Sequence, residues 1–214
     1  MNNLVNKIFI AIPNPGTINI RLAINLIGWT HDPRYVIKIY MPSYISPLPA
    51  VRNLCVKEFL ISDCGYIWWI DDDVIPPQET LHRLVSADKD AIGAVCFSIG
   101  NDKDDYRPYP ITLKNANDGK YKVYYGENIE EVDAVGGGCV MVKRKVYEML
   151  EPPYYEDSFD KDGILSLTGD FRIWQKTKEK GFKLWIDFNL LCEHNREVNI
   201  KALQDFIEKV ENGK

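Results

Sequence analysis

What the sequence lacks excludes several classes of protein. Its five cysteines form no CxxC pair and are odd in number, which argues against a zinc site and indicates a reducing compartment. No apolar run approaches the roughly 18 residues that a membrane span requires, and residues 8–12 are too short for a signal peptide. We therefore expect a cytoplasmic protein without a transmembrane segment.

Basic residues are too few for a nucleic-acid-binding surface. The 214 residues include 26 Lys and Arg against 31 Asp and Glu, a formal net charge of −5, whereas nucleic-acid-binding proteins normally present a basic face. We expect no nucleic-acid partner. With 45% hydrophobic and 27% charged residues, the chain has the composition of an ordinary globular protein with a substantial core.

Strand-like and helix-like segments alternate in the first part of the chain. Strands are predicted at 7–12, 35–40, 66–70 and 91–97, and helices at 18–29, 50–62 and 76–86. This βαβαβ order predicts an α/β fold with a Rossmann-like, doubly wound, mostly parallel sheet.

The second part of the chain is less regular. A protruding β-hairpin is predicted within 98–128, with strands at 109–113 and 121–125, and a long loop at 151–167. Further strands are predicted at 132–142, interrupted by three glycines, and at 182–187, and helices at 144–150, 169–180 and 200–211.

Three consecutive aspartates follow the most apolar of the predicted strands. Residues 66–70 are apolar or aromatic throughout, as strands buried on both faces are, and Asp71, Asp72 and Asp73 come next. In an extended segment residues 71 and 73 face the same side, so their carboxylates can share a ligand set. Mg²⁺ and Mn²⁺ are commonly held by one or two carboxylates plus phosphate oxygens. We expect such a site here; the alternative is an acidic cap on the following helix.

Other polar residues could complete such a site. His194 follows an apolar segment of the same predicted sheet and could ligate a metal, or be a structural or surface histidine. Asp170 precedes a helix and could be a general base or a simple N-cap. Arg52 could pair with phosphate and Asn53 with a base or ribose, or both could lie on a solvated helix face. Gly136–Gly138 permit close approach of a ligand, or form a strand bulge.

In this order the motifs resemble those of DxD-containing, family-2-like glycosyltransferases that use nucleotide sugars and have the GT-A fold. The matching features are a strand with a proline loop at 8–14, Arg52–Asn53, the apolar strand with its aspartates at 67–73, Val-Gly-Gly-Gly-Cys-Val-Met-Val at 135–142, the helix led by Asp170 with Gly181 eleven residues on, and His194. One departure is Gly169, where many relatives have an acidic residue.

The resemblance implies a role for each matching position. Mn²⁺ or Mg²⁺ would be held by Asp73 and His194, with Asp71 on the ribose or a metal-bound water. The remaining implied contacts are Asp72 near the donor sugar, Pro13 and Asn14 beside the base, Arg52 near the ribose or diphosphate, Gly137 against the sugar, and Asp170 as the acceptor-side carboxylate.

The resemblance also implies a reaction and a division of the chain. The donor would be a UDP- or GDP-linked sugar and the acceptor an unknown glycan, lipid or small molecule, with inversion favoured over retention. A single domain over 1–214 would comprise a nucleotide-binding half at 1–97, an acceptor and sugar half at 98–199, and a C-terminal helix at 200–214. A sugar-phosphate nucleotidyltransferase and a non-catalytic nucleotide- or carbohydrate-binding module are the alternatives.

Overall fold

A computed structural model of the chain describes residues 6–13, 16–99, 106–116, 120–195 and 197–212. The helices are α1 (Ile20–Thr30), α2 (Leu48–Ile61), α3 (Thr80–Ser86), α4 (Arg144–Glu148), α5 (Gly169–Glu179) and α6 (Ile200–Glu211). The strands of the main sheet are β1 (Asn6–Ala11), β2 (Tyr35–Tyr40), β3 (Tyr66–Ile70), β5 (Ala91–Val95), β10 (Ile129–Val132), β12 (Cys139–Lys143) and β15 (Leu184–Leu191).

The main sheet is mostly parallel, as the sequence predicts. Its seven strands lie in the order β10-β15-β5-β12-β3-β1-β2. β1 is parallel to β2 and β3, β15 is parallel to β5, and only β12 and β10 run against their neighbours. The predicted α/β, doubly wound architecture is confirmed.

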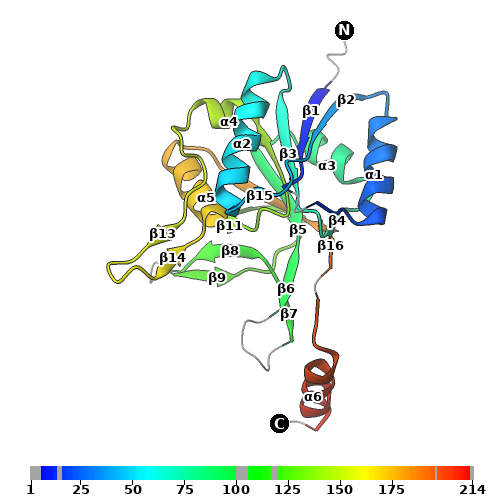
Figure 1. The fold of residues 1–214 in the computed structure, drawn as a ribbon, viewed down its shortest axis with the longest axis vertical. Coiled ribbons are helices and arrows are strands. Elements are labelled where there is room, and N and C mark those ends of the chain that lie inside the picture. The colour runs from blue at the N-terminus through cyan, green and yellow to red at the C-terminus, as the bar shows by residue number, and fades with distance from the viewer. Residues whose placement is uncertain (1–5, 14–15, 100–105, 117–119, 196, 213–214) are drawn as a thin grey trace.

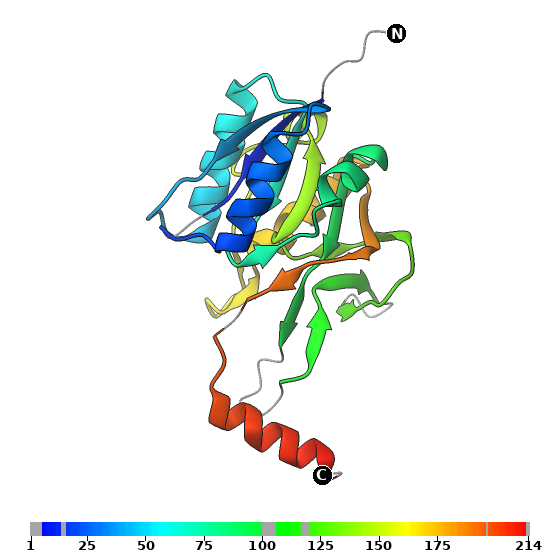
Figure 2. The ribbon, with the colours of Figure 1, turned by 90° about the vertical axis from the view of Figure 1, so that its right-hand side faces the viewer.

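Helices cover both faces of this sheet (Figures 1 and 2). Successive residues of a strand point to opposite faces, so Ile8 of β1 packs in the core beneath α1 and α3, and Phe9 in the core beneath α2, α4 and α5. In β3, Trp68 and Trp69 divide in the same way. Both faces of these strands are buried, which explains why the segments are apolar throughout.

The antiparallel direction of β12 brings its first residues to the edge where β3 ends. Ile70 of β3 lies opposite Cys139 of β12, and the amide of Asp71 donates to the carbonyl oxygen of Gly138 at 3.0 Å. The aspartates after β3 and the glycines before β12 are therefore neighbours at the carboxyl end of the parallel strands.

Short strands surround this edge and account for most departures from the predicted elements. They are β4 (Val74–Ile75) with β16 (Glu193–His194), β6 (Phe97–Ile99) with β7 (Pro108–Pro110), β13 (Ser158–Phe159) with β14 (Leu165–Leu167), and β8 (Thr112–Asn115) between β9 (Tyr121–Val123) and β11 (Ala134–Val135). The β8–β9 pair is the predicted hairpin, although the strand predicted at 109–113 is divided between β7 and β8. Residues 117–119, between β8 and β9, lie outside the described residues.

Several predicted elements have different bounds. The strand predicted at 132–142 is divided by the glycines into β11, in the three-stranded sheet, and β12, in the main sheet. The segment predicted as one strand at 91–97 divides at Cys96, whose carbonyl oxygen accepts from Ile111. The helix predicted from Pro76 begins at Thr80, because β4 takes up the residues just before the prolines. The loop predicted at 151–167 contains the β13–β14 hairpin.

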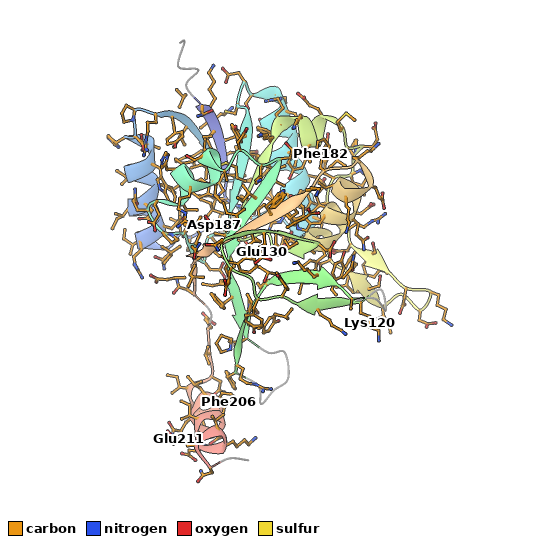
Figure 3. The ribbon with its side chains drawn as sticks, turned by 180° about the vertical axis from the view of Figure 1, so that it is seen from behind. Lys120, Glu130, Phe182, Asp187, Phe206 and Glu211 are labelled. Carbon is orange, nitrogen blue, oxygen red and sulfur yellow. The ribbon has the colours of Figure 1, made fainter. Side chains whose placement is uncertain are left out.

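The predicted C-terminal helix is α6, which lies apart from the rest of the protein (Figures 1 and 3). None of its residues is buried, and Phe206 contacts the ring of Tyr106 at 6.0 Å between centroids. Within the described ranges, none of the helices combines the length and apolar character needed to cross a bilayer. The division of the chain into halves at residue 97 stays a prediction, since the main sheet takes strands from both.

Candidate functional site

The three aspartates form a tight turn and not the extended segment that the sequence suggests. The amide of Val74 donates to the carbonyl oxygen of Asp71 at 3.0 Å, which closes a four-residue turn. The turn is held from outside by Asn195, whose amide donates to Asp73 O at 2.9 Å. Because α3 begins only at Thr80, the aspartates do not cap that helix.

The pairing of β4 with β16 brings His194 to Asp73. His194 lies opposite Val74 in this pair, and its Nε2 is 3.2 Å from Asp73 Oδ2. Its Nδ1 is 2.6 Å from the carbonyl oxygen of Phe97, an acceptor, so Nδ1 carries the proton. In the neutral ring Nε2 then presents its lone pair toward Asp73, the arrangement that a metal-binding histidine uses.

The donor set at this point suits a hard divalent cation but is incomplete. Among the described residues no group of three or more His, Cys, Asp or Glu side chains could hold a metal by itself. A carboxylate and an imidazole are suitable ligands for Mn²⁺, and Mg²⁺ and Mn²⁺ commonly take further oxygens from substrate phosphate. The residues present fit a cation whose coordination is completed by a ligand.

Arg52 joins the aspartate turn to the start of α5. Its Nη2 is 3.1 Å from Asp71 Oδ1, and its Nε is 2.6 Å from Asp170 Oδ1. The Arg52 side chain is 1% exposed, so a solvated helix face is excluded. Burial opposes the positive charge, but the carboxylates of Asp170 and Asp71 outweigh it and raise the pKa of Arg52. The site therefore contains an Asp71–Arg52–Asp170 bridge between two elements far apart in sequence.

The aspartate turn carries more negative charge than Arg52 offsets. Burial is the largest cause of a raised pKa at Asp71; Arg52 opposes it, and the charges of Asp170 and Asp73 add to it. Burial and the charges of Asp73 and Asp71 likewise raise the pKa of Asp72. A cation at this turn would relieve the repulsion.

The glycines before β12 allow close packing against the bridge. A Cβ at Gly137 would overlap Arg52 Nη2, and a Cβ at Gly138 would lie 3.5 Å from Asp71 Oδ2 and 3.1 Å from Val74 Cγ2. The glycines are thus required because side chains of the protein itself, Arg52 above all, pack closely against their backbone.

Asp170 is also one of the residues that line a small pocket. It lies in the first turn of α5, after the N-cap Thr168, so it is not itself the N-cap. The pocket has a volume of about 260 Å³ and is lined by Pro47, Leu48, Pro49, Tyr155, Asp157, Thr168, Gly169 and Asp170. A carboxylate at the wall of a pocket is available to a bound molecule.

Solved structures with the same arrangement of elements include glycosyltransferases. A197 from STIV aligns with a TM-score of 0.61 at 17% identity, over 90% of this chain and 86% of that one. GalNAc-T7 with UDP, GalNAc and Mn²⁺ aligns with a TM-score of 0.54 at 12% identity, over 99% of this chain. S. aureus TarS 1–349 in complex with UDP-GlcNAc aligns with a TM-score of 0.51 at 11% identity, over 95%. The chain has the GT-A fold.

Its relation to these proteins is one of fold. The chain spans 48% of the GalNAc-T7 chain and 64% of the TarS chain. No protein-family model and no curated protein sequence matches it. In this fold the site described above lies at the carboxyl edge of the central strands, where open α/β sheets bind their ligands.

Three further positions are expected beside the base or ribose of the donor: Pro13, Asn14 and Asn53. Pro13 is buried just after β1, and Asn14 lies outside the described residues. The amide of Asn53 is used by the backbone: Nδ2 donates to Tyr155 O at 2.7 Å, and Oδ1 accepts from the Tyr154 and Tyr155 amides at 2.8 and 3.0 Å. Both lone pairs of Asn53 Oδ1 and one of the two N–H groups of Nδ2 are thus engaged by the 154–155 segment, so we assign Asn53 to fixing that segment in place of the expected contact with a base or ribose.

Sequence reasoning missed the aromatic residues that enclose Arg52. The guanidinium lies 5.3 Å from the Trp69 ring centroid and 5.8 Å from that of Tyr155. Trp69 Nε1 donates to Tyr147 Oη at 3.0 Å, and the Tyr147 and Tyr155 hydroxyls are 2.8 Å apart. Tyr155 stands in a segment predicted only as a loop, and no local pattern marks its contact with Arg52.

Proposed function

We propose that this chain is a glycosyltransferase that moves a sugar from a UDP- or GDP-linked donor to an acceptor hydroxyl, with Mn²⁺ or Mg²⁺. The observation that carries the proposal is the pairing of Asp73 with His194 beside the Asp71–Arg52–Asp170 bridge, at the ligand-binding edge of a GT-A sheet. Structural neighbours that hold UDP, or a UDP-sugar, support it.

Asp73 and His194 would hold the cation, with Asp71 on the ribose or on a metal-bound water. When bound, the ion would stabilise the negative charge that develops on the leaving diphosphate. The Phe97 carbonyl oxygen keeps His194 in the tautomer that exposes Nε2. Asp72 near the donor sugar, Gly137 against the sugar, and Pro13 and Asn14 beside the base belong to the same proposal.

Asp170 would accept the proton of the acceptor hydroxyl. It pairs with Arg52 and lines the pocket, so it is the carboxylate that we assign to a hydroxyl bound there. A base on the acceptor side of the sugar corresponds to inversion. The Arg52 side chain is 1% exposed and therefore offers little surface that a diphosphate could contact. We assign Arg52 to positioning Asp71 and Asp170, and not to the expected contact with the ribose or diphosphate of the donor.

The test is a screen of UDP- and GDP-sugars for release of nucleoside diphosphate with and without Mn²⁺. Turnover should require the metal, and Asp73→Asn should abolish it. Asp63→Asn, which changes a 76% exposed aspartate paired with Lys7, should retain full activity. Full metal-dependent activity in Asp73→Asn would refute the metal assignment.

Binding measurements separate the remaining alternatives. Calorimetry should show that Mn²⁺ binds more tightly with UDP or GDP present than alone, because the diphosphate completes the coordination. Nucleotide binding without any turnover would indicate a non-catalytic module. Release of pyrophosphate from a nucleoside triphosphate and a sugar phosphate would indicate a nucleotidyltransferase, a class normally marked by a basic, glycine-rich loop after the first strand.

We also propose a reducing, cytoplasmic location. All five cysteines are buried and carry free thiols in the structure. Persistence of free thiols is typical of reducing compartments. Thiol titration of the denatured, unreduced protein from its natural source should return five thiols per chain.

A further inference from the structure

The pocket beside Asp170 is too small to enclose a whole acceptor. Its volume of about 260 Å³ is below the roughly 300–1,000 Å³ of sites that enclose a small ligand. It can hold the part of an acceptor that bears the reacting hydroxyl. The rest of the acceptor must then lie against the surface around the pocket mouth, so the chemistry of that surface indicates what the acceptor is.

One side of the mouth is the β13–β14 hairpin, which projects from the body of the protein (Figure 1). Asp157 immediately before β13 and Thr168 immediately after β14 both line the pocket, so the hairpin begins at the pocket wall. Phe159 and Leu165 are directly paired across it and share one face. Phe159 is 62% exposed and Leu165 49% exposed, next to Ile164 at 65%.

The other side of the mouth is the start of α2. Pro47, Leu48 and Pro49 line the pocket, and Leu48 is nevertheless 47% exposed. A Cβ at Gly169 would lie 3.3 Å from Pro49 Cγ, so this segment packs directly against the start of α5. We call Leu48, Phe159, Ile164 and Leu165 the apolar rim. These side chains are exposed on the two segments that lead away from the pocket, and exposed apolar groups beside a site offer surface that a ligand can bury.

Two acidic residues of the hairpin segment, Asp157 and Asp160, are engaged by backbone amides. Asp160 Oδ1 accepts from the amides of Asp162 and Ile164 at 2.9 Å, which fixes the hairpin turn. Asp157 Oδ1 accepts from the Gly169 amide at 2.7 Å. These carboxylates have local structural partners, whereas the rim side chains present hydrocarbon surface.

We propose that the acceptor is an amphiphile, with a hydroxyl-bearing head group in the Asp170 pocket and an alkyl chain on the apolar rim. This inference rests on the proposed function for the role of Asp170. Each methylene that the rim buries is worth roughly fourfold in affinity, so two of them exceed tenfold. A hydrophilic glycan would bury less hydrocarbon on the rim than an alkyl chain does.

Binding of octyl glucoside, below its micellar concentration, and of methyl glucoside tests the proposal. Calorimetry should give at least about tenfold tighter binding of the octyl compound. The double variant Phe159→Ser with Leu165→Ser should reduce this ratio at least about fivefold and leave methyl glucoside binding unchanged. Ile24→Ser, at a 59% exposed position on α1, is the matched control and should keep the full ratio.

Several outcomes would overturn the proposal. They are equal binding of the two glucosides, an unchanged ratio in the double variant, and an equal loss in Ile24→Ser, which would mean nonspecific adsorption. Circular dichroism of the double variant should match the wild type, because both side chains are exposed. Rim-dependent octyl glucoside binding without turnover of any nucleotide sugar would support the amphiphile site and refute the transferase.

Discussion

Replacing Arg52 by methionine tests whether the buried bridge organises the site. Methionine keeps an apolar stem between Trp69 and Tyr155 but removes the charge that pairs with Asp71 and Asp170. Two carboxylates then share a partly buried space without a cation. The variant should be less stable and should lose turnover, since both groups lose their common anchor.

The loss of stability follows from the burial of the three side chains. Removing one partner of a buried ion pair costs about 3–5 kcal/mol. Asp71 and Asp170 retain 29% and 21% exposure, so water compensates part of the cost, and we expect about 3 kcal/mol. A domain is typically stable by about 5–15 kcal/mol, so the variant should still fold.

Urea unfolding followed by tryptophan fluorescence measures this change. With an m-value of about 3 kcal/mol/M, the midpoint should fall by about 1 M. The control is Arg21→Met, which removes a two-pronged pair between Arg21 and Glu193 whose side chains are 60% and 54% exposed. Because solvent screens that pair, its midpoint should not move.

The destabilisation should depend on pH in a defined direction. Burial already raises the folded-state pKa of Asp71 above its ordinary value of 3.8, and loss of Arg52 raises it further. The cost of ionising Asp71 is absent below the unfolded-state pKa and develops as the pH rises through the folded-state pKa. The stability difference should narrow toward pH 4 and widen toward neutrality. A midpoint shift no larger than that of Arg21→Met, or one that is equal at both pH values, would refute the reasoning.

Other substitutions probe the same site. Gly137→Ala should lower the free energy of unfolding by about 1–3 kcal/mol and reduce turnover, because its Cβ would displace Arg52. In the same urea and turnover assays Gly65→Ala should change neither stability nor turnover, because nothing lies within 4 Å of the new Cβ. Asn53→Ala should cost about 2–3 kcal/mol by removing three hydrogen bonds, while calorimetry gives unchanged UDP affinity. Asp73→Asn should abolish the strengthening of Mn²⁺ binding by UDP.

The sequence predicts those parts of the fold that depend on local pattern. The strands at 35–40 and 66–70 and the helix at 200–211 have the predicted bounds, because apolar alternation, a buried run and helical spacing are each evident within a few residues. The doubly wound α/β architecture follows from the order of the predicted elements, whereas the GT-A fold is expected from the resemblance of the motifs to those of GT-A glycosyltransferases.

Features that depend on distant partners were not predictable in this way. β4 and β16 have two residues each, too few to show a period, and each is a strand only because the other is present. Arg52 lies on a helix whose sequence is compatible with a solvated face; it is buried against Trp69, Tyr155 and Asp170, the last of which is 118 positions away. The Asp71–Asp73 turn differs from the expected extended chain because β4 needs the chain to reverse at that point.

The contact between Asp73 and His194 also bears on how the protein folds. The two residues are 121 positions apart, and β16, which pairs with β4, follows directly on β15, which pairs with β5. Contacts of such sequence separation form slowly, because a long loop must close first. The contact between Asp73 and His194 should thus form in the last phase of refolding, after the local helices and β1–β3. The Mn²⁺-dependent nucleotide binding proposed above would then report completion of folding.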